Sequence, residues 1–187
     1  ALRSLLKDRN VQVRNAAEHA LENLVYRPSY QLRVRTMGSF HVWRGEEEVR
    51  DRDWRSIKAR QLLQLLLVEY GRMLSRERIM DMLWPGLDTE AAANNLRVTL
   101  SRLTKALEPE RPEGAPAYYI LQQGDTYGFN IESDHQLDSA DFAAAVARGQ
   151  VAEHANQSQQ AMEAYRAAIT LYGGIFLPDS LYEDWSV

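Results

Sequence analysis

The sequence contains no cysteine among its 187 residues. This absence excludes disulfide bonds, thiol chemistry and cysteine-based zinc sites. The histidines are scattered along the chain without the spacing of metal ligands, so we expect each to be a surface or packing residue, and we predict no metal and no cofactor. These histidines are His19, His41, His135 and His154.

Long hydrophobic runs are also missing. No apolar stretch approaches the roughly 18 to 20 residues that span a bilayer, and the amino terminus has no signal-peptide pattern. Because 45% of the residues are hydrophobic, the chain still has enough apolar surface for a real core. We therefore expect a soluble globular protein of the cytoplasm, with no membrane partner.

Catalytic motifs are absent as well. The sequence has no glycine-rich phosphate loop and no set of serine, histidine and aspartate typical of nucleophilic catalysis. Its clustered carboxylates lie in runs typical of solvated surface, such as Glu46 to Glu48. We therefore predict that the chain is not an enzyme.

Charge is distributed unevenly along the chain. The net charge of −4 argues at first against a nucleic-acid partner. However, residues 132–187 hold 9 acidic and only 2 basic side chains, whereas residues 26–131 hold 16 basic and 14 acidic ones. A basic face in the middle of the chain could therefore still meet a polyanion.

Residues 1–26 predict a helical hairpin that breaks near Asp8 to Asn10. The Leu-Leu-Lys-Asp turn, the following Val-Arg pair and the spaced alanines resemble a single HEAT-type repeat. One such repeat cannot bury its faces alone, so we expect either a piece of a longer protein or a cap on the next domain. An unrelated amphipathic hairpin is the alternative. The second helix would present Val13, Ala16, Ala17, Ala20, Leu21 and Leu24 as its apolar face.

The middle of the chain begins with period-two alternation. Leu32 and Val34, then Phe40 and Val42, alternate with polar residues on either side of a turn at Gly38. This pattern predicts antiparallel strands in a small sheet of three or four strands.

Helical periodicity follows the sheet. The first predicted helix covers "SIKARQLLQLLLVEYG" and ends at Gly71. Ser75 caps the second helix, which Pro85 stops, and Asp88 or Thr89 caps a third that runs to about Leu107. The stretch "YYILQQGDTYGFNI", residues 118–131, then predicts a hairpin around Gly124 and Asp125.

The third helix contains "NNLRVTLSRLTKAL", residues 94–107, which carries three basic side chains and no acidic one. Its leucines fall on one narrow stripe that must face a core. The polar residues lie on the opposite side, either as a solvated face or as a binding surface. The stripe consists of Leu96, Leu100, Leu103 and Leu107.

Sheet, three helices and closing hairpin are in the order of a winged helix-turn-helix. The predicted class is α+β: an N-terminal antiparallel sheet, a winged helix-turn-helix and a C-terminal hairpin wing, flanked by HEAT-like and TPR-like all-α segments. In such folds the third helix enters the DNA major groove and the wing reaches a neighbouring phosphate or groove.

Several stretches resemble the SARP family of bacterial transcriptional activators, over about residues 31–187. They are "LRVRTMGSFHVW", "KARQLLQLLL", "LSRERIMDMLWPG", "AANNLRVTLSRLTKAL", "YYILQQGDTYGFNI", "ITLYGGIFLPD" and "YEDW". The resemblance implies an OmpR/PhoB-type winged helix followed by the start of a TPR-like bacterial transcriptional activation domain. The expected domains are 1–26, 31–131 and a truncated 136–187.

The end of the chain has helical spacing in two stretches, with Asp138 or Ser139 as a cap. We expect the tail to fold back on those two helices. The apolar and aromatic residues of the tail are Phe176, Leu177, Leu181, Tyr182 and Trp185.

The winged-helix pattern implies DNA contacts on the third helix. Asparagine can pair with adenine and arginine with guanine, whereas serine and lysine suit phosphate oxygens. We predict base contacts for Asn94 and Arg97, a thymine-methyl contact for Val98, and either role for Arg102. The candidate residues are Asn94, Asn95, Arg97, Val98, Ser101, Arg102 and Lys105.

Weaker contacts are predicted elsewhere. Gln122 and Gln123 stand where response-regulator relatives often place an arginine, and a neutral side chain neutralises a phosphate less well, so wing contact is left open. For the basic residues before the first two helices, a solvated edge is the alternative. The weaker candidates are Gln122, Gln123, Thr126, Arg55, Lys58, Arg60 and Arg76.

The loop "WPGLDTE", residues 84–90, joins the second and third helices. In relatives this loop commonly touches RNA polymerase, which would involve Leu87, Asp88 and Glu90; a plain cap and turn is the alternative. The leading hypothesis is therefore a sequence-specific double-stranded DNA-binding activator that recruits RNA polymerase and binds direct repeats as a tandem dimer. The alternative is a protein-interaction scaffold whose winged helix does not bind DNA.

Overall fold

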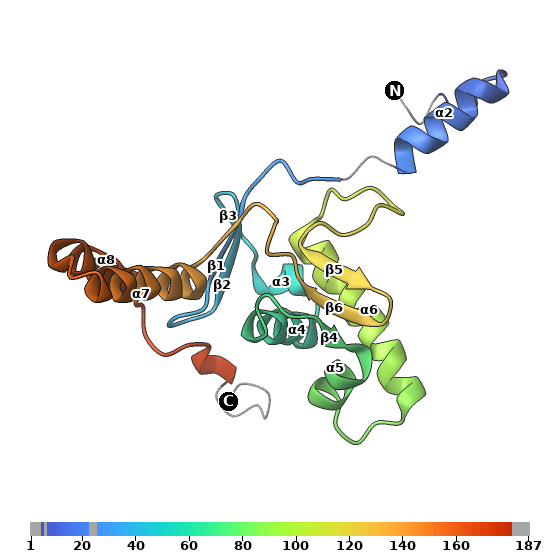
Figure 1. Cartoon of the computed structure of the whole chain (residues 1–187). Coiled ribbons are helices and arrows are strands. Elements are labelled where there is room, and N and C mark those ends of the chain that lie inside the picture. The colour runs from blue at the N-terminus through green and yellow to red at the C-terminus, as the bar shows by residue number, and fades with distance from the viewer. Residues whose placement is uncertain (1–4, 6, 23–25, 181–187) are drawn as a thin grey trace.

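The computed structural model describes residues 5, 7–22 and 26–180. Its body consists of two β-sheets on either side of a central group of helices, and a helical hairpin extends from the first sheet (Figure 1). Within the described residues no helix is both long and apolar enough to cross a membrane. The same residues contain no group of three or more histidine or acidic side chains that could hold a metal ion.

The first sheet has four strands in the order β3-β2-β1-β7. They are β1 (Leu32–Arg35), β2 (His41–Arg44), β3 (Glu47–Glu48) and β7 (His135–Leu137). The predicted alternation is confirmed, because Leu32, Val34 and Val42 are buried in the core. Strand β7 pairs in parallel with β1, with Val34 opposite Leu137. The sequence pattern does not predict β7, which completes the sheet from a hundred residues further along the chain.

The helices of the winged helix follow the first sheet. They are the short α3 (Asp51–Trp54), then α4 (Ile57–Val68), α5 (Arg76–Leu83) and α6 (Thr89–Leu107). Two predicted caps are confirmed: the Ser75 hydroxyl accepts a hydrogen bond from the Arg78 backbone N–H, and the Asp88 carboxylate accepts one from that of Ala91. The predicted end of α4 at Gly71 is too late, because Glu69 already caps its C-terminus.

A second sheet closes the winged helix, with the strand order β4-β6-β5. The strands are β4 (Leu74–Ser75), β5 (Ile120–Gln123) and β6 (Thr126–Phe129). The predicted hairpin is confirmed, and its turn uses Gly124 with a φ of 58°, a left-handed conformation that favours glycine. Because β4 lies between α4 and α5, it ties the hairpin to the helices.

The helical hairpin consists of α7 (Asp138–His154) and α8 (Ser158–Leu171). The two helices approach closely where the Tyr165 ring lies against Gly149, since a β-carbon at Gly149 would clash with that ring. The opening of α7 differs from the prediction. Its N-cap residue is Leu137, without a side-chain cap. The carboxylate of Asp138 instead reaches across to the first sheet, where it accepts hydrogen bonds from the backbone N–H groups of Thr36 and Met37.

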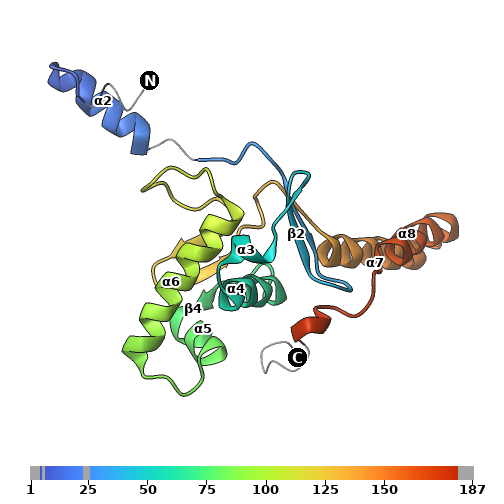
Figure 2. The same ribbon diagram turned by 180° about the vertical axis from the view of Figure 1, so that it is seen from behind.

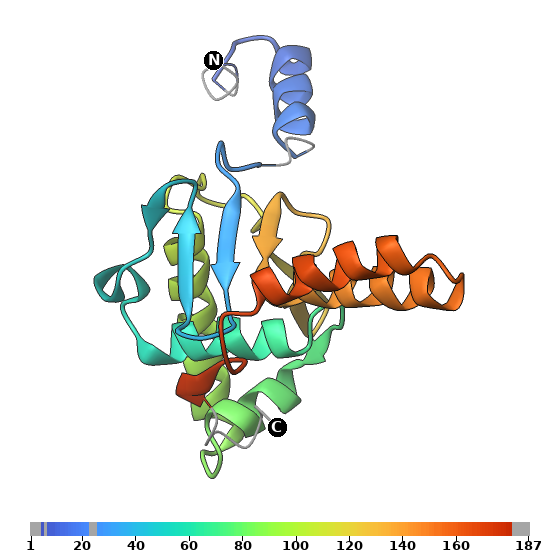
Figure 3. The ribbon, with the colours of Figure 1, turned by 90° about the vertical axis from the view of Figure 1, so that its left-hand side faces the viewer.

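The segment after α8, residues 173–180, crosses back to the first sheet, and we call it the strap (Figure 3, red). It includes the short 3₁₀ helix η1 (Pro178–Ser180). The Leu177 N–H donates to the Thr36 carbonyl at 2.7 Å, and the Gly38 N–H donates to the Ile175 carbonyl at 2.9 Å.

The prediction that the tail folds back on its own helices is therefore wrong for the residues that the structure describes. Leu177 is buried in the core of the body, and Phe176 forms a bridge with Met37. The physical reason is that the turn between β1 and β2 offers backbone groups that the strap satisfies, together with apolar surface. Leu181, Tyr182 and Trp185 lie outside the described residues.

Helix α2 (Val11–Glu22) stands apart from the body in all three ribbon views (Figure 2). It corresponds to the second helix of the hairpin predicted for residues 1–26, whereas most of the first helix falls outside the described residues. The HEAT-like interpretation remains a prediction. The boundary proposed at residue 136 falls within β7.

Candidate nucleic-acid interface

Helix α6 combines a buried stripe with an exposed polar strip. Leu96, Leu103 and Leu107 are buried in the core, as predicted, and Leu100 is half-buried at the edge of the stripe. With this stripe fixed inward, helical geometry forces the residues about half a turn away to point outward. The leucine stripe thus orients the strip that carries the predicted DNA contacts.

The predicted residues of α6 all lie on or beside this outward strip. Asn94, Arg97, Ser101, Arg102 and Lys105 are exposed. Asn95 and Val98 are half-buried at the margins of the strip. The structure therefore brings these seven side chains together on one surface.

Two hydrogen bonds order this strip. The Arg97 guanidinium donates to the Asn94 side-chain carbonyl at 3.0 Å, which holds the two predicted base-reading side chains beside each other. The Lys105 ammonium donates to the Pro109 carbonyl at 2.6 Å. Among the described residues, neither Arg97 nor Arg102 has an acidic partner within ion-pair distance, so both positive charges remain uncompensated on the surface.

A groove of about 870 Å³ separates α6 from the β5–β6 hairpin. Apolar side chains including Leu96, Leu100 and Tyr127 line it, together with Arg76, Arg97 and Arg111. Of the predicted residues, Arg76, Arg97, Ser101 and Gln122 therefore border a single depression. Arg76, a weak candidate, lies at the start of α5 and borders the groove beside α6, and its DNA contact stays a prediction.

The wing tip is exposed and has no basic side chain. Gln122 and Gln123 are both exposed, and the Gln122 amide donates to the Gly124 carbonyl at 3.2 Å. Thr126 uses its hydroxyl proton for the Gln123 carbonyl, at 2.8 Å. These bonds brace the turn, so the wing offers amide groups and a braced backbone, and the charge at its tip is the negative one of the exposed Asp125.

The basic residues before and within α4 are placed differently from one another. Arg55 is exposed with a left-handed φ of 55°, and Lys58 is half-buried in the first turn of α4. Arg60 lies under the strap, where it pairs with Asp179 at 3.0 Å and donates to the Phe40 carbonyl at 3.3 Å. The Arg60 guanidinium therefore bonds to partners within the chain, and the geometry does not support its predicted contact with the DNA backbone.

The loop between α5 and α6 projects into solvent. Leu87 is 48% exposed, and Asp88 and Glu90 are exposed as well. The carboxylate of Asp88 caps α6, so its charge is partly used at the positive end of the helix. An exposed leucine beside acidic side chains is compatible with a protein contact.

Glu108 is a site residue that sequence reasoning missed. It directly follows α6, is completely buried, and accepts hydrogen bonds from the backbone N–H groups of Tyr118 and Tyr119. Burial raises the pKa of this carboxyl above its usual range. A glutamate at the end of an amphipathic helix ordinarily indicates a solvated terminus, so hydrophobic periodicity does not predict that Glu108 is buried.

A substitution of Gly128 in β6 tests how closely the wing packs against the residues before β4. A β-carbon there would lie 2.9 Å from the Arg72 carbonyl oxygen and would also meet the Met73 sulfur. We expect Gly128→Ala to destabilise the protein by about 1 to 3 kcal/mol, the usual cost of overpacking. Denaturant unfolding measures the change. Gly124→Ala serves as the control, because that site has open space and only a left-handed φ. Equal losses in the two variants would argue against close seating at Gly128.

Comparisons with known proteins agree with this geometry. Residues 55–123 match the family model described as "Transcriptional regulatory protein, C terminal". Comparison with curated protein sequences gives no significant match. Among solved structures, Mycobacterium tuberculosis EmbR in complex with a low-affinity phosphopeptide is similar, with a TM-score of 0.67 and 20% identity over 81% of this chain and 38% of that chain.

These matches confirm the α+β winged-helix fold and the resemblance to SARP-type regulators at the level of that fold. The matched family consists of DNA-binding regulators and not of enzymes, in agreement with the predicted lack of catalytic activity. The present chain spans about 38% of the length of EmbR.

Proposed function

We propose that this chain, which carries the winged-helix domain of transcriptional regulatory proteins, is a sequence-specific activator that binds double-stranded DNA and recruits RNA polymerase. The observation that carries the proposal is the outward strip of α6. Between Asn94 and Leu107 it has exposed donors and no carboxylate, and the arginines at its centre lack acidic partners among the described residues.

Base readout is assigned to the centre of the strip. Arg97 can present two donors to guanine, and Asn94 can pair with adenine. Their mutual hydrogen bond orients both before DNA arrives, which lowers the entropic cost of ordering them on binding. Val98, half-buried at the margin, can meet a thymine methyl group, and Asn95 is a further candidate. Arg102 can serve either bases or phosphates.

Phosphate contacts are assigned to the periphery of the strip. Ser101 and Lys105 suit phosphate oxygens, and Arg76 joins them across the groove. Arg55 and Lys58 are weaker candidates on exposed or half-buried positions. At the wing, Gln122, Gln123 and Thr126 can supply neutral hydrogen bonds. The wing therefore contributes less charge neutralisation than α6 does.

We assign polymerase contact to the loop that carries Leu87, Asp88 and Glu90, because all three are exposed and follow directly on the supporting helix. Binding to direct repeats as a tandem dimer, the division into 1–26, 31–131 and 136–187, and a TPR-like identity for α7 and α8 belong to the same proposal.

A scaffold role is the second candidate. Val151 of α7 and Ile169 of α8 are 71% and 73% exposed, so both present apolar side chains to solvent. These exposed side chains favour a protein contact by the helical hairpin. That contact can coexist with DNA binding, and it becomes the leading function only if α6 binds no duplex.

The decisive experiment is selection from a random duplex library, followed by affinity measurements across a salt series for the wild type and Lys105→Ala. We expect enrichment of a repeated motif. Lys105→Ala should weaken binding uniformly across sequences and reduce the slope of log K against log salt by about 1, since a lost phosphate contact releases one counterion fewer. If no motif is enriched and binding at low salt is negligible, the scaffold role takes the lead.

A further inference from the structure

The carboxylate of Glu108 joins the end of α6 to the base of the wing. One of its oxygens, Oε1, accepts the backbone N–H groups of Tyr118 and Tyr119, both at 2.9 Å. The two tyrosines lie 10 and 11 residues further along the chain, directly before β5. A single side chain therefore bridges the whole loop 109–117.

The two tyrosines that Glu108 holds pair in turn with Asn130, which follows β6 at the base of the hairpin. The Asn130 N–H donates to the Tyr119 carbonyl at 2.9 Å, and the Asn130 side chain donates to the Tyr118 carbonyl at 2.8 Å. The Tyr119 hydroxyl in turn donates to the Tyr30 carbonyl at 2.9 Å, while the Tyr30 hydroxyl donates to the Leu107 carbonyl at 2.6 Å. The helix end, the hairpin base and the entry to the first sheet are thus fixed to one another.

This position is costly for an acidic side chain. The C-terminal end of a helix carries partial negative charge, which repels a carboxylate. The second oxygen, Oε2, has no hydrogen-bond partner among the described residues and faces only the Arg111 Nε, at 3.6 Å. Burial and the helix dipole both disfavour a carboxylate at this position. The backbone groups that Glu108 holds therefore explain its presence better than its own contribution to stability does.

The other attachment of the hairpin lies near its tip. Strand β4 pairs through Leu74 and Ser75 with Tyr127 and Thr126, the β6 residues nearest the turn. Glu108 holds the opposite end. Without Glu108, the hairpin base would be linked to the end of α6 indirectly through Tyr30, which bonds both Tyr119 and Leu107. The angle between the hairpin and α6 would then be held less firmly, because the loop 109–117 imposes no fixed distance.

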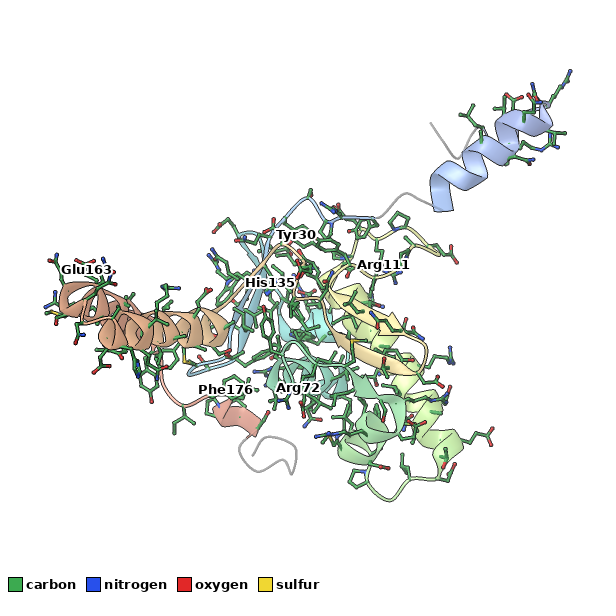
Figure 4. All side chains as sticks on the ribbon, in the orientation of Figure 1. Tyr30, Arg72, Arg111, His135, Glu163 and Phe176 are labelled. Atoms are coloured by element: carbon green, nitrogen blue, oxygen red, sulfur yellow. The ribbon has the colours of Figure 1, made fainter. Side chains whose placement is uncertain are left out.

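We propose that Glu108 is a positioning residue for DNA binding, which sets the angle and spacing of the β5–β6 wing relative to the reading helix α6. The inference rests on the proposed function, in which α6 and the wing address the same duplex. Glu108 touches no DNA itself. It also holds Arg111 beside the groove, at the upper end of α6 and β5 (Figure 4).

The test compares variants on two duplexes, the selected operator and the same operator shortened to remove the DNA under the wing. Glu108→Ala should lower affinity for the full operator roughly tenfold, the order of one or two lost neutral hydrogen bonds at the wing, and leave the salt slope unchanged, because the wing contacts DNA through uncharged side chains. On the shortened duplex it should bind like the wild type. Glu108→Gln keeps an oxygen that can accept both N–H groups, so it should bind like the wild type on both duplexes.

A control variant and a replacement variant accompany this comparison. Glu113→Ala removes an exposed carboxylate from the same loop and should change nothing. If Glu108→Ala does not fold, Glu108→Asp takes its place, since a shorter carboxylate cannot reach both N–H groups and should show a smaller loss confined to the full operator. A merely structural role would lower binding to both duplexes equally.

The outcomes separate this inference from the proposed function. If the wild type binds the operator and a folded Glu108→Ala or Glu108→Asp variant binds it with wild-type affinity, the positioning role is overturned and DNA binding stands. If the wild type selects no duplex, the proposed function fails, and the positioning role fails with it.

Discussion

Arg97→Ala is expected to lower affinity for the selected operator about 10- to 100-fold, which corresponds to about 1 to 3 kcal/mol for one two-pronged base contact. The guanidinium is exposed on the outward strip of α6, lacks an acidic partner among the described residues, and is held beside Asn94. Discrimination at the base position that Arg97 reads should relax at the same time. Competition binding against operators substituted at each position measures both effects.

The matched control is Arg148→Ala, which removes the same charge from an exposed position on α7. It should leave affinity and discrimination unchanged, because α7 extends from the first sheet on the side away from α6 (Figure 1). Equal losses in Arg97→Ala and Arg148→Ala would show that only overall charge matters. A loss of affinity without relaxed discrimination would assign Arg97 to a phosphate.

Asp138→Ala is expected to reduce the free energy of unfolding by about 2 to 5 kcal/mol, because it leaves two backbone N–H groups without an acceptor at the junction of α7 and the first sheet. Its carboxylate accepts from the Thr36 N–H at 2.8 Å, the Thr36 hydroxyl at 2.6 Å and the Met37 N–H at 2.9 Å. Thr36 is completely buried, which makes the loss of an acceptor for its N–H group costly.

Denaturant unfolding followed by circular dichroism measures this loss. Asp141→Ala is the control, since Asp141 is exposed on the first turn of the same helix and its removal should cost no more than about 0.5 kcal/mol. Asp138→Asn keeps one acceptor and should fall between the two. An unfolding free energy for Asp138→Ala close to that of Asp141→Ala would contradict the anchoring role of Asp138.

Local signals account for most of the winged helix. Helix α6 was predictable because its leucine stripe, its cap at Asp88 and its length all lie within one continuous stretch. The β5–β6 hairpin was predictable for the same reason, from a glycine turn between two short apolar runs. Strand β7 is only three residues long, and its extended conformation depends on pairing with β1. No local sequence pattern predicts that pairing.

The residues of the candidate site also differ in whether the local sequence could predict them. The exposed strip of α6 follows from helical geometry once the leucines face inward, so its seven residues could be named from the sequence. Glu108 could not, because its burial depends on two tyrosine N–H groups across a loop. The ion pair of Arg60 could not be predicted for a similar reason, because its acidic partner Asp179 lies 119 residues further along the chain.

The parallel pairing of β1 with β7 has a consequence for synthesis on the ribosome. At roughly 5 to 20 residues per second, on the order of 5 to 20 seconds pass between the emergence of β1 and that of β7. During this interval one edge of β1 has no partner, and an unpaired edge is a template for aggregation. The nascent chain therefore completes its first sheet only after the whole of α6 and the β5–β6 hairpin have been made, so the winged-helix fold matures late, together with the helical hairpin that follows it.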